Sequence, residues 1–309
     1  MALLKNKKFL GGIAVAVSLV AGVSVKTLLF SSDEVSFASG AELTAYYDSL
    51  GYTLDGVVAG EAIVPRLLLE KVPSKWRGIQ GADARKDVFF RTMLPLVLEA
   101  NGKVTRDRAR LLQLQSRAEK GQPIDGDDLV WLRGLAEKYE VEDWQGIDES
   151  NQLDRLVRRV DVVPVSLALI QAAVESAYGR SRFAREGNAL FGQWAWGKGM
   201  EPADQRDGKG DYRVAAFKSP LASVEAYLLN LNTHPAYQDF RVRRAAIRAQ
   251  GDDVLRGLDL VGGLSAYSEK GEAYLEILSK AIRANGLGRF DGASMAAEEA
   301  VKLVPNLRR

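Results

Sequence analysis

An almost uncharged stretch runs from Val162 to Gly179, VVPVSLALIQAAVESAYG, and its single charged residue is Glu175. Apolar residues recur within it at helical spacing and form one stripe: Leu167, Ile170, Val174 and Tyr178. Small residues occupy the opposite face and allow close packing. Asp161 is a candidate N-cap, Pro164 fits a first helical turn, and Gly179 can end a helix. The pattern predicts a buried central helix.

Before this stretch the hydrophobic pattern is amphipathic and predicts a helical array without a β-rich block. The expected segments are 41–71, broken by glycines, 83–99 with a kink at Pro95, 105–120, 127–139 and 148–159. The pair Asn101-Gly102 is expected to end the helix of residues 83–99.

After the central helix the pattern changes. Residues 193–196 and 212–217 predict two short strands around a polar, glycine-rich loop, which is typical of a β-hairpin. Further helices are expected at 219–234, 238–250, 252–258 and 268–285, with a surface helix at 294–303. The whole pattern predicts a mainly α fold with a small β-hairpin lobe.

The N-terminus has the pattern of a membrane-targeting segment. Lys5, Lys7 and Lys8 precede an apolar run within residues 9–30. Such a run indicates either a signal peptide or a membrane anchor with its N-terminus inside. The run is longer than a typical signal-peptide core, and the best cleavage candidate, 36–38, lies far downstream, which favours an uncleaved anchor. We expect a protein anchored in the cytoplasmic membrane and facing the periplasm or outer side, or secreted to the periplasm if the segment is cleaved.

Composition narrows the possible chemistry. The 309 residues include no cysteine, which excludes disulfides, thiol nucleophiles and cysteine-ligated zinc. His234 is the only histidine, so a serine triad or a histidine-based metal site is not expected. We expect neither a metal nor a cofactor. The formal net charge of +2, with scattered basic residues, gives no reason to expect a nucleic-acid partner.

Glu175 is the candidate for chemistry because it lies near the end of a buried helix. Burial disfavours the charged carboxylate, so its pKa should rise and the residue could hold a proton near neutral pH, as a general acid must. The alternative is a buried glutamate paired with a nearby arginine, Arg180 or Arg182.

The segment 171–196, QAAVESAYGRSRFAREGNALFGQWAW, resembles the motif of glycoside hydrolase family 73, the peptidoglycan-cleaving N-acetylglucosaminidases. That motif combines an alanine-rich helix carrying a Glu-Ser pair with a Gly-Asn-x-Leu-Phe-Gly loop. Ala266-Tyr267-Ser268 resembles the family's late tyrosine motif. The similarity covers roughly residues 150–290. The helical segment before it resembles only the Bax-type subgroup of bacterial proteins in this superfamily. Tyr178 stands where tryptophan is common in the motif.

The resemblance implies a lysozyme-like fold preceded by a helical prefix, with a cleft for the glycan strand of peptidoglycan. Four segments follow: a membrane anchor or signal segment (1–30), a helical prefix packing on the catalytic domain (31–150), a glucosaminidase domain (151–292) and a C-terminal tail (293–309). The implied reaction is hydrolysis of β-1,4 bonds of N-acetylglucosamine, with Glu175 as general acid.

The resemblance also suggests further site residues. Tyr267 would stabilise developing positive charge or the acetamido group. Candidates for a second carboxylate are Glu201, which is preferred, and Asp204, Asp207 and Asp211, although attack by the substrate's own N-acetyl group would need none. The predicted substrate-binding residues are Gln171, Tyr178, Asn188, Phe191, Trp194 and Trp196. The two tryptophans alternate along one strand and could stack on sugars or anchor the hairpin.

Two other functions stay open. A lytic transglycosylase would also use one glutamate and no second carboxylate, although its usual Gly-Leu-Met-Gln loop is absent. The other is a non-catalytic, membrane-tethered wall-binding module whose catalytic site has decayed. The presence of Glu175, Asn188 and Tyr267 argues against a decayed site.

Overall fold

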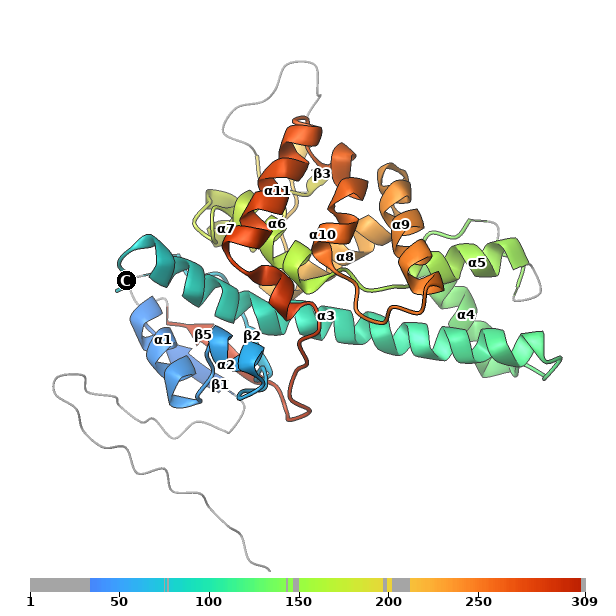
Figure 1. Cartoon of the computed structure of the whole chain (residues 1–309), viewed down its shortest axis with the longest axis horizontal. Helices are drawn as coiled ribbons and strands as arrows, with labels where there is room; N and C mark the ends of the chain where they lie inside the picture. The colour runs from blue at the N-terminus through green and yellow to red at the C-terminus, as the bar shows by residue number, and fades with distance from the viewer. Residues whose placement is uncertain are drawn as a thin grey trace, which may run out of the picture. The chain divides into compact units, whose positions relative to one another are not determined.

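The computed structural model describes residues 34–74, 76, 78–142, 144–146, 150–196, 199–201 and 212–306. Residues 32–309 form one compact unit, which is mainly helical (Figure 1). The predicted anchor at 1–30 lies outside the described residues. Among the described helices, none is long and apolar enough to cross a membrane.

Helix α3, Ala82–Glu119, is the longest element and has 38 residues, which corresponds to about 57 Å. Between positions 88 and 97 every residue is buried, because the helix is covered on more than one side. It packs against α1 (Gly40–Ser49), α6 (Val165–Ser176) and α8 (Pro220–Thr233). Figure 1 shows α3 crossing between the N-terminal elements and the later helices.

The expected helix end at Asn101-Gly102 is wrong, since α3 continues through both residues. Asn101 is buried, and its side-chain nitrogen donates to the Val163 carbonyl at 2.8 Å while its oxygen accepts from the Val163 N–H at 3.2 Å. Because both hydrogen-bond partners of the Asn101 side chain lie on another segment, this side chain does not compete with the helix for backbone hydrogen bonds. Asn101 thereby holds the segment that leads into α6.

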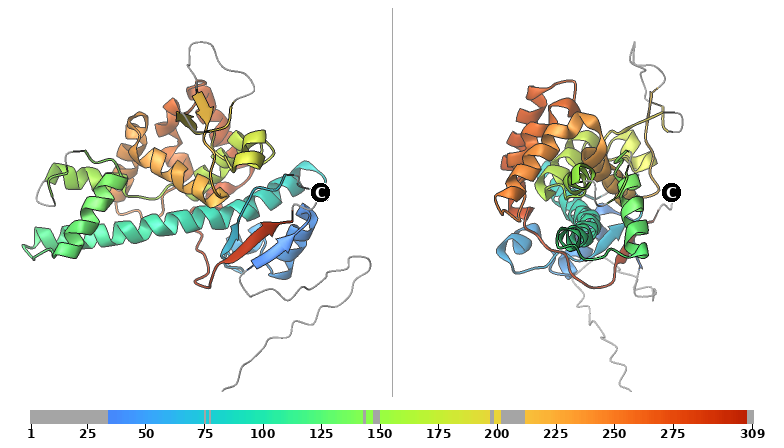
Figure 2. Two further views of the ribbon diagram at one scale, coloured as in Figure 1. Left: turned by 180° about the vertical axis from the view of Figure 1, so that it is seen from behind. Right: turned by 90° about the vertical axis from the view of Figure 1, so that its right-hand side faces the viewer.

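The first half of the described chain contains strands, so the expectation of a purely helical array there is wrong. Strands β1 (Glu34–Phe37) and β2 (Leu67–Leu69) flank β5 (Val301–Pro305) in a parallel sheet ordered β1-β5-β2. Figure 2 shows β5, in red, beside the blue strands. Leu303 of β5 is buried at the centre. The expected surface helix at 294–303 is therefore also wrong, because apolar side chains alternate toward the core over the five residues of the strand.

The central helix forms as α6, but three details of its prediction are wrong. Its N-cap is Pro164, not Asp161, and the Ser166 N–H of its first turn is bound by the Asp291 carboxylate at 2.8 Å. Val174 of the expected stripe is exposed. The helix ends at Ser176, so Tyr178 lies beyond it.

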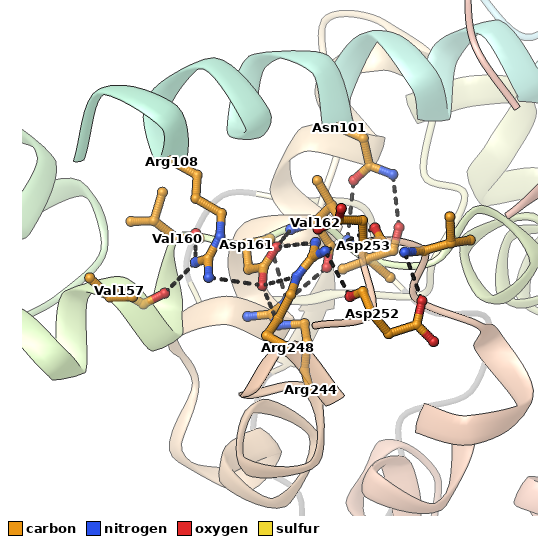
Figure 3. A network of polar contacts seen from close by, with 12 residues as sticks. Asn101, Arg108, Val157, Val160, Asp161, Val162, Arg244, Arg248, Asp252 and Asp253 are labelled. Carbon is orange, nitrogen blue, oxygen red and sulfur yellow. Dashed lines mark hydrogen bonds and ion pairs between the residues drawn. The ribbon is translucent and has the colours of Figure 1, made fainter. Parts of the chain in front are cut away.

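Asp161 is instead the centre of a buried ion cluster (Figure 3). Its carboxylate pairs with Arg248 at 2.9 Å, Arg108 at 3.6 Å and Arg244 at 3.8 Å. Burial alone would raise the pKa of Asp161, but the charges of Arg244, Arg248 and Arg108 outweigh it and hold that pKa below its ordinary value. The cluster joins α3, the segment before α6, and α9 (Gln238–Ala249).

The elements after α6 follow the expected order. The hairpin is confirmed: β3 (Trp194–Trp196) pairs antiparallel with β4 (Tyr212–Val214). The helix expected at 252–258 is wrong, because α10 covers only Gly257–Leu260. The other described helices of the chain are α2 (Leu54–Ala59), α4 (Gly126–Lys138), α5 (Ser150–Arg159), α7 (Arg182–Gly187) and α11 (Glu272–Ala284), with 3-10 turns η1 (Pro235–Tyr237), η2 (Val261–Tyr267) and η3 (Leu287–Phe290).

The mainly α class is confirmed. The lysozyme-like assignment stays a prediction. The domain boundary near residue 150 also stays a prediction, and the packing of α3 against α6 and α8 crosses it.

Candidate functional site

The C-terminal end of α6 reverses the chain sharply. Ala177, Tyr178 and Gly179 all adopt positive φ, at 51°, 56° and 73°. The Ser176 hydroxyl accepts from the Gly179 N–H at 2.8 Å and donates to the Ala172 carbonyl, which fixes the turn. As a result the last helical turn is held rigidly and Glu175 has a defined position.

The Glu175 side chain is half-buried. Its Oε1 accepts from the Tyr274 hydroxyl at 2.7 Å. Its Oε2 lies beside the backbone of Gly192, where a Cβ atom would sit 3.5 Å away. Gly192 has φ of +62°, a conformation that favours glycine, so no side chain stands between Oε2 and the space around it.

A chain of three hydrogen bonds ends at Glu175. The Tyr227 hydroxyl donates to Gln171 Oε1 at 2.6 Å, Gln171 Nε2 donates to the Tyr274 hydroxyl oxygen at 3.2 Å, and Tyr274 donates to Glu175. Since a carboxamide nitrogen only donates, the Tyr274 proton must point to Glu175. Gln171 and Glu175 lie four residues apart on α6 and so share a face.

Burial raises the pKa of Glu175, and the Tyr274 hydrogen bond and the positive charge of Lys270 only partly oppose it. Burial, followed by the nearby Glu175 charge, raises the pKa of Tyr274, so its hydroxyl stays protonated as a donor. A carboxyl group that retains its proton at higher pH, beside a neutral donor, is suited to general acid catalysis.

An aromatic wall supports this arrangement. Tyr267 and Tyr274 stack in parallel, with ring centroids 5.7 Å apart. Phe191 stacks on Tyr227 at 4.0 Å, and Tyr237 packs against Tyr267 at 5.9 Å. These rings come from α8, η1, η2, α11 and the loop after α7, so five segments converge on the end of α6.

Neither arginine proposed as an alternative partner bonds Glu175 among the described contacts. Arg180 donates to the Ala177 carbonyl, and Arg182 pairs with Glu186 and donates to the Glu201 carbonyl. The prediction of a raised pKa thus stands on burial, with no ion pair to cancel it.

Residues 150–281 match the family Glucosaminidase, described as mannosyl-glycoprotein endo-β-N-acetylglucosaminidase. The match includes α6, the loop after α7 and most of α11. We call these residues, 150–281, the glucosaminidase domain after the family that they match. That family is one of glycoside hydrolases, as the sequence motif indicates.

The chain is also similar to Protein bax of Escherichia coli (strain K12), with 35% identity over 190 residues. The aligned region is 62% of this chain and 66% of that protein, so the chain spans a little under two thirds of the relative's length. No solved structure matches the chain.

Within the glucosaminidase domain, the structure brings three predicted residues to Glu175. Gln171 is buried and supports Tyr274 rather than facing outward. Phe191 is buried against Tyr227. The Tyr267 hydroxyl donates to the Phe191 carbonyl at 2.9 Å, so this tyrosine binds the loop that passes Glu175. Direct substrate contact by these residues stays a prediction.

Two other predicted residues serve packing in this structure. Asn188 is buried, accepts from the Val72 N–H at 3.0 Å and donates to the Phe217 carbonyl at 3.0 Å. Tyr178 packs edge-on against Phe89 and Phe90 of α3. Both therefore bind the glucosaminidase domain to neighbouring segments, and substrate contact by either stays a prediction.

The remaining predicted residues belong to the hairpin. Glu201 is exposed and pairs with Arg213 at 3.0 Å. Trp194 and Trp196 lie on β3, opposite Val214 and Tyr212. The side chains of the two tryptophans, together with Asp204, Asp207 and Asp211, lie outside what the structure describes.

Two residues of the site were not predicted from the sequence. Tyr274 and Tyr227 complete the hydrogen-bond chain to Glu175. The available signal was weak: both are aromatic residues on apolar helical faces, which is also what ordinary core tyrosines look like. Within the described ranges, no group of acidic, cysteine or histidine side chains could hold a metal ion.

Proposed function

We propose that the glucosaminidase domain hydrolyses β-1,4 bonds of N-acetylglucosamine in the glycan strands of peptidoglycan, with Glu175 as the general acid. The observation that carries this proposal is the environment of Glu175. The carboxyl is half-buried, has a raised pKa and is bound by a neutral tyrosine hydroxyl instead of a cation.

The hydrogen-bond directions assign the two carboxyl oxygens. Because Tyr274 donates to Oε1, that oxygen accepts and cannot itself carry a proton toward Tyr274. The catalytic proton therefore resides on Oε2, beside Gly192. From there it passes to the glycosidic oxygen as the bond to the anomeric carbon breaks, and the leaving sugar departs as an alcohol.

Tyr274 acts as a positioning residue in this scheme. Its hydroxyl is aligned by Gln171, whose own carbonyl oxygen is bound by Tyr227. Gln171, Tyr227 and Tyr274 therefore fix the orientation of the Glu175 carboxyl before substrate arrives, which is the arrangement that efficient proton transfer requires.

The second half of the reaction needs a nucleophile for the developing oxocarbenium ion. Either a carboxylate activates water or the substrate's N-acetyl group attacks first and water follows. Glu201 stays the candidate carboxylate. Tyr267 would stabilise the positive charge or the acetamido group, as the family resemblance implies.

Digestion of purified glycan strands, followed by mass analysis of the new ends, tests the reaction. Hydrolysis next to N-acetylglucosamine predicts a reducing N-acetylglucosamine end. An anhydro-sugar end would instead identify a lytic transglycosylase, and a reducing N-acetylmuramic acid end would identify a different bond. No product at all would support a non-catalytic wall-binding module.

We also propose that residues 1–30 anchor the protein in the cytoplasmic membrane with the domain outside, as the basic and apolar pattern indicates. A C-terminal reporter active only in the periplasm should then give signal in cells. Signal from a cytoplasm-only reporter fused at the same place would contradict this topology.

A further inference from the structure

A second candidate binding site lies in a groove between α5 and the start of α9. It has a volume of about 560 Å³, and its lining includes four arginines and one aspartate, Asp154. The arginines are Arg155, Arg158, Arg159 and Arg241. The whole chain has a formal net charge of only +2, so this concentration of positive charge is local.

An adjoining groove contains arginines that lie beside a carboxylate. There Arg244 and Arg248 pair with Asp161, and Arg108 donates to carbonyls at the end of α5 (Figure 3). All three guanidinium groups lie within 3.8 Å of one carboxylate, that of Asp161.

The groove of Arg155, Arg158, Arg159 and Arg241 lacks such balance. Arg241 is buried, and its guanidinium donates to the carbonyls of Leu231 and His234. Burial, followed by the nearby charge of Arg159, lowers the pKa of Arg241 to about 10. Among the described residues, no carboxylate forms an ion pair with Arg241.

Arg159 shows the same strain between like charges. Its guanidinium donates to the backbone carbonyls of Tyr139 and Glu140. Burial lowers the pKa of Arg159, and the positive charge of Arg155 adds to that effect, while the charges of Glu140 and Glu142 oppose it. Three guanidinium groups therefore repel one another, and a bound anion would relieve that repulsion.

The groove is linked to the candidate active site through η1. Pro235 and Gln238 line the groove, and between them lies Tyr237, whose ring packs on Tyr267 of the aromatic wall. Tyr267 in turn stacks on Tyr274, the partner of Glu175. The groove and the candidate active site are thus built on packed neighbouring elements, η1, η2 and α11.

We propose that this groove binds the carboxylate groups of the acidic peptides that a peptidoglycan strand carries. Guanidinium groups bind carboxylates in a bidentate geometry, and the volume suits a short peptide. The proposal rests on the proposed function, because it assigns the groove to the same substrate. The groove then selects strands that bear peptides over bare glycan.

The test uses a double variant in which the two exposed arginines are both replaced, Arg155→Gln and Arg158→Gln. Both side chains are exposed, and neither guanidinium forms a hydrogen bond with the described residues, so the double variant should fold. For peptide-bearing strands, KM should rise roughly tenfold with kcat unchanged, as expected for the loss of charged hydrogen bonds. For strands stripped of peptides, both constants should match those of the wild type.

Arg243→Gln is the matched control, since it removes a charge from α9 outside the groove and should change neither substrate's KM. An equal rise in KM for both strands, or no rise for either, would overturn the proposal. Calorimetry with a short acidic peptide and with inorganic phosphate provides a second readout. The wild type should bind the peptide and the double variant should not, while preference for phosphate would contradict a carboxylate site.

The calorimetric arm also separates the two proposals. If the wild type cuts neither strand, the proposed hydrolase function fails. Peptide binding lost in the double variant would still support the groove, and peptide binding unchanged in that variant would refute it.

Discussion

The Tyr274 hydroxyl donates a hydrogen bond of 2.7 Å to Glu175 Oε1, joining residues that lie 99 positions apart in the chain. Because Gln171 binds the tyrosine oxygen from the other side, the direction of this bond is fixed. The relationship turns a partly buried glutamate into a carboxyl with one occupied oxygen and one free to transfer a proton.

Tyr274→Phe should lower kcat and move the basic limb of the pH–rate profile to higher pH. The Tyr274 hydrogen bond lowers the pKa of Glu175, so its loss leaves burial less opposed and raises that pKa further. The expected loss of rate is about tenfold to a hundredfold, because Glu175 is retained but less well oriented. The profiles of kcat and of kcat/KM against pH measure the loss of rate and the shift of the basic limb.

Tyr47→Phe is a suitable control for that variant. Tyr47 is also buried and its hydroxyl bonds Thr92, but it belongs to α1 and does not contact Glu175. It should cost about 1 kcal/mol of stability and leave the pH profile unchanged. A Tyr274→Phe profile that superimposes on the wild type would refute the positioning role.

Tyr267→Phe tests whether the late tyrosine acts by holding the loop next to Glu175. Its hydroxyl binds the Phe191 carbonyl, so the variant should lose about 0.5–1.5 kcal/mol and raise KM more than it lowers kcat. Denaturant unfolding and steady-state kinetics measure the two quantities. A large fall in kcat alone would instead indicate direct action on the transition state.

The C-terminal strand should matter for stability. Leu303 is buried at the centre of the parallel sheet, and Leu303→Ala should reduce the free energy of unfolding by about 2–5 kcal/mol. Lys302→Ala, at an exposed position of the same strand, should change it by less than about 0.5 kcal/mol. Similar midpoints for both variants in urea would show that β5 is dispensable.

The sequence predicted α6 and its single charge because a continuous apolar run leaves few alternatives to a buried helix. It also predicted the β3–β4 hairpin, whose strands lie close together in the chain. Its failures have a different physical origin. Strand β5 is five residues long and pairs with β1, more than 260 positions away, so no local pattern reveals it.

The same reason explains the missed site residues. Neither Tyr227 nor Tyr274 carries a local signal for its role, since that role arises only where α8, α6 and α11 meet. Asp161 shows the converse case. Its position before a helix suggested an N-cap, but three distant arginines bind it more strongly than the helix does.

Asp161→Asn should be among the most destabilising polar substitutions in the domain. It leaves Arg244 and Arg248 without their carboxylate, at a cost of about 3–5 kcal/mol. Because the folded-state pKa of Asp161 is below 3.8, its contribution is present above that pH and is lost as pH falls through the folded-state pKa. Thermal unfolding from pH 7 downward, roughly to pH 2, should show the variant converging on the wild type. A constant difference would contradict the assignment.

Glu175 has the opposite linkage to pH. Its folded-state pKa lies above the ordinary 4.5, so its stabilising contribution is complete below that pH and is lost as pH rises through the folded-state value. Glu175→Gln cannot ionise and should therefore become more stable relative to the wild type as pH rises. Unfolding midpoints of both proteins across this range check the sign.

The most direct test of the central claim is the rate at which Glu175→Gln cleaves purified glycan strands at the wild-type pH optimum. The variant keeps the side-chain shape, and Glu186→Gln, exposed on α7, controls for the loss of one charge. General acid catalysis by Glu175 predicts a rate lower by about 10² to 10⁴ in a protein that still unfolds cooperatively, with the control unaffected. A rate within a few-fold of the wild type would contradict the account.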